Sequence, residues 1–182
     1  YGDGPLALTG SGPTTLAMAY MGLTGKTNFS PTEIAQQASK SNYADGESGS
    51  KDEMFSKLPR TMGLVSENYS TSAENLLYYL GDNTVFAVQL KANTLTDQAH
   101  WALVVNSNAD GSVTVFDPTS TTISKMPWAM TTIANASDYF YAISASDETL
   151  AELEEADGTS ESEGTSGNAT ESAETPAEGT ND

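Results

Sequence analysis

A histidine and an aspartate, two residue types that commonly cooperate in proton transfer, flank one predicted turn of this chain. His100, the only histidine, begins an apolar run over residues 100–106, and Asp117 ends a second run over residues 112–117. Turn-forming residues between the runs predict an antiparallel β-hairpin. A turn centred near residues 108–110 pairs positions whose numbers sum to about 217 to 219, which sets Asp117 opposite His100 to within about one residue.

A carboxylate beside an imidazole orients the ring and stabilises its charged form, so the pair predicts a general base with its orienting group. Each residue also has a simpler interpretation when taken alone. A histidine at a strand start is commonly structural, and Asp117-Pro118-Thr119 is an ordinary turn sequence. Trp101, next to the predicted base, is expected in the core because large aromatic side chains are mostly buried.

Ser11 is the candidate for a nucleophile position. It stands just before a predicted apolar helix over residues 13–21, which Gly22 is expected to end. A side chain there feels the positive end of the helix dipole and borders backbone N–H groups that could form an oxyanion hole. Serine is also a favoured N-cap residue, so a purely structural role is the alternative.

The remaining elements separate into helices first and strands after. Capping boxes starting at Ser30, Ser50 and Thr71 predict helices that run to about Ser39, to Gly63 and to Gly81. β-branched and aromatic residues predict strands over residues 84–90 and 138–144, in addition to the hairpin. Helices followed by a strand meander predict an α+β fold, with N-terminal helices packed on a C-terminal antiparallel sheet.

Charge and composition narrow the function classes. The chain of 182 residues has 25 acidic and 7 basic residues, a net charge of -18 that disfavours nucleic acid and anionic membrane surfaces. No apolar run approaches the ~20 residues needed to cross a bilayer. The chain has no cysteine, and its acidic residues show no metal-ligand spacing, so neither a metal nor another cofactor is expected.

The composition changes near Ser146, which predicts one domain over residues 1–145 and an acidic low-complexity tail over residues 146–182. The tail has no lysine or arginine and is rich in Ser, Thr, Glu, Ala and Gly, so about its last 25 residues are expected to be disordered. A short helix is expected over residues 145–156. The tail is interpreted either as a spacer or as a solvating segment, and it favours an extracellular or cell-surface location.

Four segments in order resemble the papain-like peptidases that process bacteriocin leaders (peptidase family C thirty-nine). The sequence GSGPTTLAM over residues 10–18 is similar to that family's GCGPTSLAM, with serine in place of cysteine. The other segments are residues 23–49, similar to the second helix and glycine-bearing loop, residues 100–105, similar to the histidine strand, and residues 113–118, similar to the strand that ends in Asp-Pro.

The resemblance implies a papain-like fold of bacterial, secreted type that acts on a peptide or protein and works as a monomer. It maps a Cys, His, Asp triad onto Ser11 at the nucleophile position, His100 as general base and Asp117 as the group that orients His100. A hydroxyl is much harder to ionise than a thiol, so the domain is expected to be an inactive relative that at most binds peptides. The alternatives are a non-enzymatic cell-surface or adhesion module, and an active hydrolase that uses Ser11.

Overall fold

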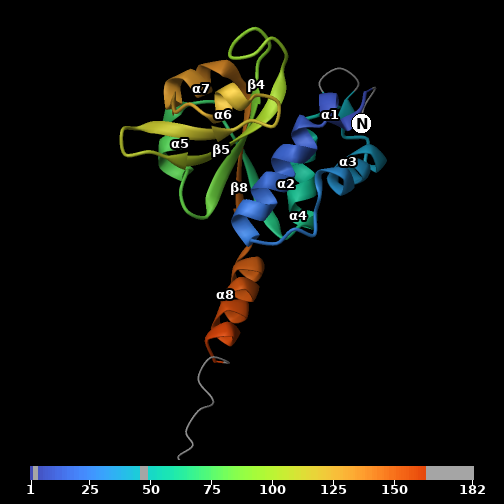
Figure 1. Cartoon of the computed structure of the whole chain (residues 1–182), viewed down its shortest axis with the longest axis vertical. Helices are drawn as coiled ribbons and strands as arrows, with labels where there is room; N and C mark the ends of the chain where they lie inside the picture. The colour runs from blue at the N-terminus through green and yellow to red at the C-terminus, as the bar shows by residue number, and fades with distance from the viewer. Residues whose placement is uncertain (2–3, 46–48, 163–182) are drawn as a thin grey trace, which may run out of the picture.

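An antiparallel sheet positions His100 and Asp117 and is covered by helices on both faces (Figure 1). The computed structural model describes residues 1, 4–45 and 49–162. The six-stranded sheet has the order β3-β8-β4-β5-β6-β7, with every neighbouring pair antiparallel. Its strands are β3 (Leu64–Tyr69), β4 (Thr84–Leu90), β5 (His100–Ser107), β6 (Ser112–Phe116), β7 (Trp128–Ala129) and β8 (Ser137–Ala145). The expected α+β class is confirmed.

The helices form two layers, one on each face of the sheet. One core contains the apolar side chains of α2 (Ser11–Thr24), α3 (Pro31–Lys40) and α4 (Glu53–Thr61). The other contains those of α5 (Ala73–Tyr79), α6 (Thr121–Ser124) and α7 (Met130–Ala136). Strand β5 serves both cores, because Trp101 faces α2 whereas its neighbour Ala102 faces the other layer. This burial on both faces explains the continuous apolar runs over residues 85–88 of β4 and 101–105 of β5.

The β5–β6 hairpin forms as predicted, with a small difference in register. Leu103 pairs with Phe116, and the pairing shifts by one position at a bulge between Val104 and Asn106. When the Leu103–Phe116 pairing is continued toward the start of β5, Asp117 lies opposite Ala102, two positions from His100. His100 and Asp117 are therefore diagonal neighbours across the hairpin, a separation that two such side chains can bridge.

The predicted helix starts have mixed outcomes. The capping box at Ser30 is confirmed, since Ser30 Oγ accepts from Glu33 N and the Glu33 carboxylate accepts from Ser30 N. The box at Ser50 is wrong, because Ser50 lies in the short strand β2 (Gly49–Ser50), paired with β1 (Ala44–Asp45), and α4 begins at Glu53. The third is shifted by one residue, with Ser72 as the N-cap of α5.

Three predicted helix ends are also corrected. Gly22 does not end α2, which continues to Thr24 and stops at Gly25, whose φ of 66° is the left-handed conformation that glycine tolerates best. The helices before Gly63 and Gly81 end at Thr61 and Tyr79. Several short elements were not predicted: α1 (Leu6–Thr9), α6, β7 and α7, and also the longer edge strand β3.

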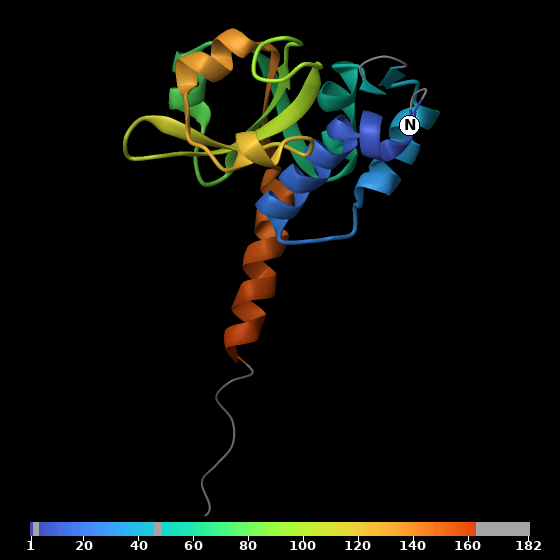
Figure 2. The ribbon, with the colours of Figure 1, turned by 45° about the horizontal axis from the view of Figure 1, so that its top comes forward.

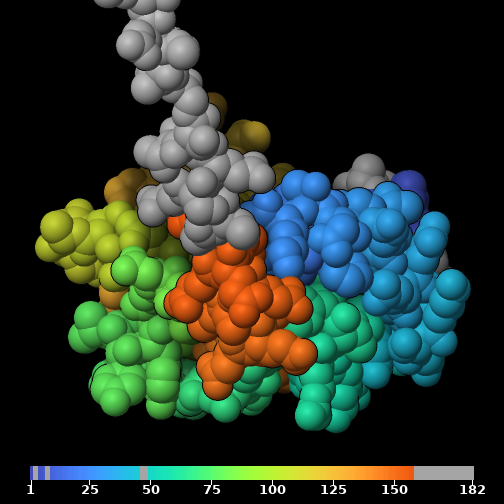
Figure 3. Space-filling view, turned by 90° about the horizontal axis from the view of Figure 1, so that it is seen from below, coloured from blue at the N-terminus to red at the C-terminus, as the bar shows by residue number. Residues whose placement is uncertain are grey.

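The C-terminal segment contains a longer helix than expected. Helix α8 (Asp147–Ser162) leaves the domain after β8 and projects away from it (Figure 2). Its first turn docks on the domain, where Thr149 Oγ1 donates to Gly63 O and Leu150 packs against the α2 core, while Lys26 forms an ion pair with Glu152 at 3.1 Å. Seen from below, α8 lies between the α2–α4 layer and the segment that contains α5 (Figure 3). The predicted disorder of residues 163–182 falls outside the described residues.

Among the described helices, none is long and apolar enough to cross a membrane.

Candidate functional site

The structure joins His100 and Asp117 in a buried pair at the open end of the hairpin. His100 Nε2 lies 2.6 Å from Asp117 Oδ2, and the two residues are only 6 % and 8 % exposed. The second oxygen of Asp117 accepts the N–H groups of Thr119 and Ser120 at 2.8 and 3.0 Å and the Thr119 hydroxyl at 2.8 Å. Asp117 therefore both begins the turn after β6 and fixes one edge of the imidazole.

This arrangement favours the charged forms of both groups. Burial by itself lowers the pKa of His100, but the hydrogen bond and negative charge of Asp117, together with the Gln98 carbonyl, outweigh burial and raise this pKa above its usual value. Burial likewise raises the pKa of Asp117, but the hydrogen bond and charge of His100 and the Thr119 donors lower it overall. The pair is thus an imidazolium beside a carboxylate at mildly acidic pH.

The other ring nitrogen faces the loop between β4 and β5. His100 Nδ1 lies 3.1 Å from the Gln98 carbonyl and 3.2 Å from Thr96 Oγ1. The Thr96 hydroxyl donates its proton to the same Gln98 carbonyl at 2.8 Å, so toward Nδ1 it is an acceptor. Both ring nitrogens therefore face acceptors, which is a second reason for the ring to hold two protons.

Ser11 is brought next to this pair without being hydrogen-bonded to it. Ser11 is the first residue of α2, and its Oγ accepts the backbone N–H of Trp101 at 3.1 Å, one residue along β5 from His100. The N-cap of α2 is Gly10, with no side-chain capping bond. The alternative of Ser11 as an N-cap is therefore wrong: its hydroxyl ties the helix start to the strand that bears His100.

Close packing holds the start of α2 against its surroundings. A Cβ atom on Gly12 would lie 2.2 Å from Ser50 Oγ, and one on Gly49 would lie 2.0 Å from the Thr9 carbonyl, with Gly49 at a φ of 81°. Trp101 is wholly buried, as expected, and its indole N–H donates to the Ser50 carbonyl at 3.3 Å. The short β1–β2 hairpin thus supports the helix start from one side and β5 from the other.

Several residues that shape the site were not identified from the sequence. Thr96 and Gln98 contact His100 from a loop, and no periodic pattern indicates which loop residue turns inward. Thr119 and Ser120 had a detectable signal, since Asp117-Pro118-Thr119 is a turn sequence, and in such turns the aspartate side chain accepts the backbone N–H groups that follow it.

No group of three or more histidine, cysteine, aspartate or glutamate side chains that could hold a metal ion is found within the described part of the chain. Comparison of the sequence with protein-family models gives no match, and no curated protein matches it. The chemistry of Ser11, His100 and Asp117 is therefore the basis for assigning a function.

Proposed function

We propose that residues 1–145 are a papain-like, peptidase-type domain of a secreted or cell-surface bacterial protein. In this proposal Ser11 holds the nucleophile position, His100 is the base and Asp117 orients His100. With serine at position 11 the domain binds an extended peptide rather than cleaving it. The observation that carries the proposal is the buried His100–Asp117 pair next to Ser11, at the first turn of a buried helix.

The contacts of His100 argue against hydrolysis by the Ser11 hydroxyl. To act as a nucleophile, the hydroxyl must give its proton to an imidazole nitrogen that has a lone pair available. His100 Nδ1 instead faces the Gln98 carbonyl, Nε2 faces Asp117, and the pKa of the ring is raised. A doubly protonated ring cannot accept that proton, but it stabilises an anion such as a thiolate.

The test is Ser11→Cys, which introduces the only thiol of the chain. The N-terminus of α2 and the His100 imidazolium should lower the pKa of this thiol below the ordinary ~8.5. We expect its alkylation by iodoacetamide to titrate at a lower pH than that of Ser107→Cys, a control at an exposed position of β5, because a comparison of titration midpoints does not depend on how buried each thiol is. Adding His100→Ala to Ser11→Cys should remove the difference.

A Ser11→Cys thiol that titrates like the Ser107→Cys control would overturn the triad assignment. The non-enzymatic surface module would then be the better proposal, and one contact already favours it: Ser11 Oγ accepting the Trp101 N–H is a structural link that needs no chemistry. Proteolysis of peptide libraries by the serine form, lost on Ser11→Ala, would instead favour the active hydrolase.

A further inference from the structure

On the sheet face opposite α2, aromatic side chains gather at the molecular surface between α5 and the edge strand β3. The Tyr69 and Tyr79 rings are tilted against each other with centroids 4.4 Å apart, and the Tyr78 ring meets Tyr79 edge-on at 4.7 Å. Tyr78 is 81 % exposed and Leu77 is 68 % exposed. We call Tyr69, Leu77, Tyr78 and Tyr79, with Glu67 and Glu74, the tyrosine surface.

The tyrosine surface is hollowed and more exposed than folding alone requires. Glu74, Asn75, Leu77, Tyr78 and Tyr79 line a shallow depression of about 590 Å³. The inner side of α5 is already anchored by Leu76, which is fully buried in the core with α7. Contiguous exposed aromatic groups of this kind mark binding surfaces more often than single exposed apolar residues do.

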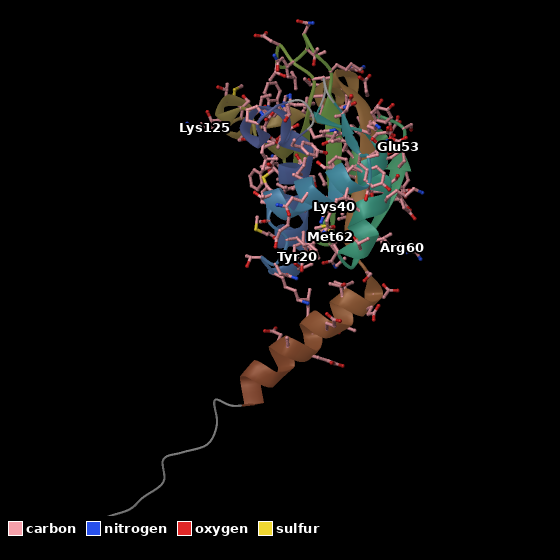
Figure 4. All side chains as sticks on the ribbon, turned by 90° about the vertical axis from the view of Figure 1, so that its right-hand side faces the viewer. Tyr20, Lys40, Glu53, Arg60, Met62 and Lys125 are labelled. Atoms are coloured by element: carbon pink, nitrogen blue, oxygen red, sulfur yellow. The ribbon has the colours of Figure 1, made fainter. Side chains whose placement is uncertain are left out.

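The two charged residues of the tyrosine surface, Glu67 and Glu74, are both acidic. Residues 61–90 contain Glu67, Glu74 and Asp82 and no lysine or arginine. Five of the seven basic residues of the chain lie between residues 26 and 60, in and beside the α2–α4 layer, where Figure 4 labels Lys40 on α3 and Arg60 on α4. A cationic ligand therefore meets acidic side chains and the electron-rich faces of tyrosine rings on the α5 side.

The backbone beside the surface indicates the shape of that ligand. β3 is the last strand at one side of the six-stranded sheet, and it pairs with β8 along one edge only. Glu67 and Tyr69 alternate along β3 and share one face of it, and the Tyr69 hydroxyl donates to the Glu67 carboxylate at 2.6 Å. An unpaired strand edge accepts an extended segment by adding backbone hydrogen bonds.

We propose that the tyrosine surface and the edge of β3 bind an extended, arginine-bearing peptide segment of another protein. The segment adds to β3 as a further strand, its arginine stacks on Tyr78 and Tyr79 near Glu74, and an apolar side chain packs on Leu77. The acidic tail of this chain is a poor occupant because it has no basic residue and like charges repel. This site is separate from Ser11, His100 and Asp117, so it does not depend on the proposed function.

The experiment titrates the full chain with a capped, fluorescein-labelled hexapeptide that alternates arginine and leucine, followed by fluorescence anisotropy. A matched peptide with citrulline in place of arginine keeps the shape and removes the charge. We expect the arginine peptide to bind more tightly, binding to weaken as salt is added, and β3 amides that do not pair with β8 to exchange hydrogen more slowly in the complex.

Tyr78→Ala should raise the Kd of the arginine peptide about 3- to 30-fold, the range expected for loss of a cation–π contact. Glu74→Gln should raise it about 2- to 5-fold. Met126→Ala, which removes a 48 % exposed apolar side chain elsewhere, should leave it unchanged. Equal binding of the citrulline peptide, or unaltered binding by Tyr78→Ala, would overturn the proposal. So would a concentration-dependent dimer that Tyr78→Ala abolishes, since the occupant would then be a second copy of this chain.

Discussion

Asp117→Asn removes the negative charge of the His100–Asp117 pair but keeps the shape of the side chain. Asp117 uses one oxygen for His100 and the other for the N–H groups of Thr119 and Ser120. Asparagine has one oxygen and one NH₂ group, so it can satisfy one of these two sides and must present a donor to the other. If the asparagine oxygen keeps the hydrogen bonds to the turn, the NH₂ group faces His100 Nε2. When His100 carries both protons, two donors then face each other.

The cost of this conflict depends on pH. The pKa of Asp117 is lowered, so its contribution is present above the unfolded value of ~3.9 and is lost as pH falls through the folded pKa. The pKa of His100 is raised, so its contribution is complete below the unfolded value of ~6.5 and is lost as pH rises through the folded pKa. The pair therefore stabilises the fold most between about pH 4 and about pH 6.5.

At pH 5.5 Asp117→Asn leaves a buried imidazolium without its carboxylate, and the free energy of unfolding should fall by about 3 kcal/mol. At pH 9 the ring can release its Nε2 proton, keep Nδ1–H on the Gln98 carbonyl and accept from the asparagine NH₂ group. The loss should then be no more than about 1 kcal/mol, the usual net value of a neutral hydrogen bond.

Urea unfolding at the two pH values measures these losses, and nuclear magnetic resonance follows the ring directly because His100 is the only histidine. The pKa of His100 should fall by about one unit or more in Asp117→Asn. Asp110→Asn, in the exposed turn of the same hairpin, should leave that pKa unchanged. An equal loss of stability at both pH values, or an unchanged His100 pKa, would refute the charged-pair interpretation.

Further predictions concern the helix start and the tail, and thermal unfolding followed by circular dichroism tests each of them. Gly49→Ala should destabilise the domain by about 3 kcal/mol or more, because the φ of Gly49 is positive and a Cβ atom there would clash with the Thr9 carbonyl. Gly22→Ala should stabilise the domain by about 0.5–1 kcal/mol, because Gly22 lies within α2 and has open space around it. Truncation after Glu155 should leave the melting temperature nearly unchanged, but truncation after Ala145 should lower it by several degrees, because Thr149 and Leu150 are then lost from the Gly63 carbonyl and the α2 core.

The sequence predicts the strands better than the helix ends. β4 has the predicted bounds and β5 differs by one residue at its end, because a strand buried on both faces leaves a continuous apolar run that turn residues limit clearly. β3 was not predicted: its sequence, LVSENY, belongs to an edge strand in which half of the positions are exposed. Gly22 was mistaken for a stop because an exposed glycine within a helix and one after it look alike in sequence.

The geometry of the candidate site could be predicted only in part. The pairing of His100 with Asp117 follows from one hairpin, where local register limits the error to about two positions. The contact of Ser11 with the Trp101 N–H joins residues 90 positions apart, and no local pattern determines it. For the same reason the capping preference of serine misled at both Ser11 and Ser50, where tertiary packing decides which hydrogen bonds form.

The buried polar side chains near Ser11 and His100 are not those that stability alone would favour. Within the described residues, eight polar or charged side chains are buried, and five of them gather where the start of α2 meets β2, β5 and the turn after β6: Ser11, Thr15, Ser50, His100 and Asp117. The hydroxyl of Thr15, one turn along α2 from Ser11, has no hydrogen-bond partner. A buried ion pair adds little net stability compared with apolar side chains of similar volume, and an unsatisfied buried hydroxyl lowers stability. A core selected for stability alone would replace these groups, so their concentration near the start of α2 supports its choice as the candidate functional site.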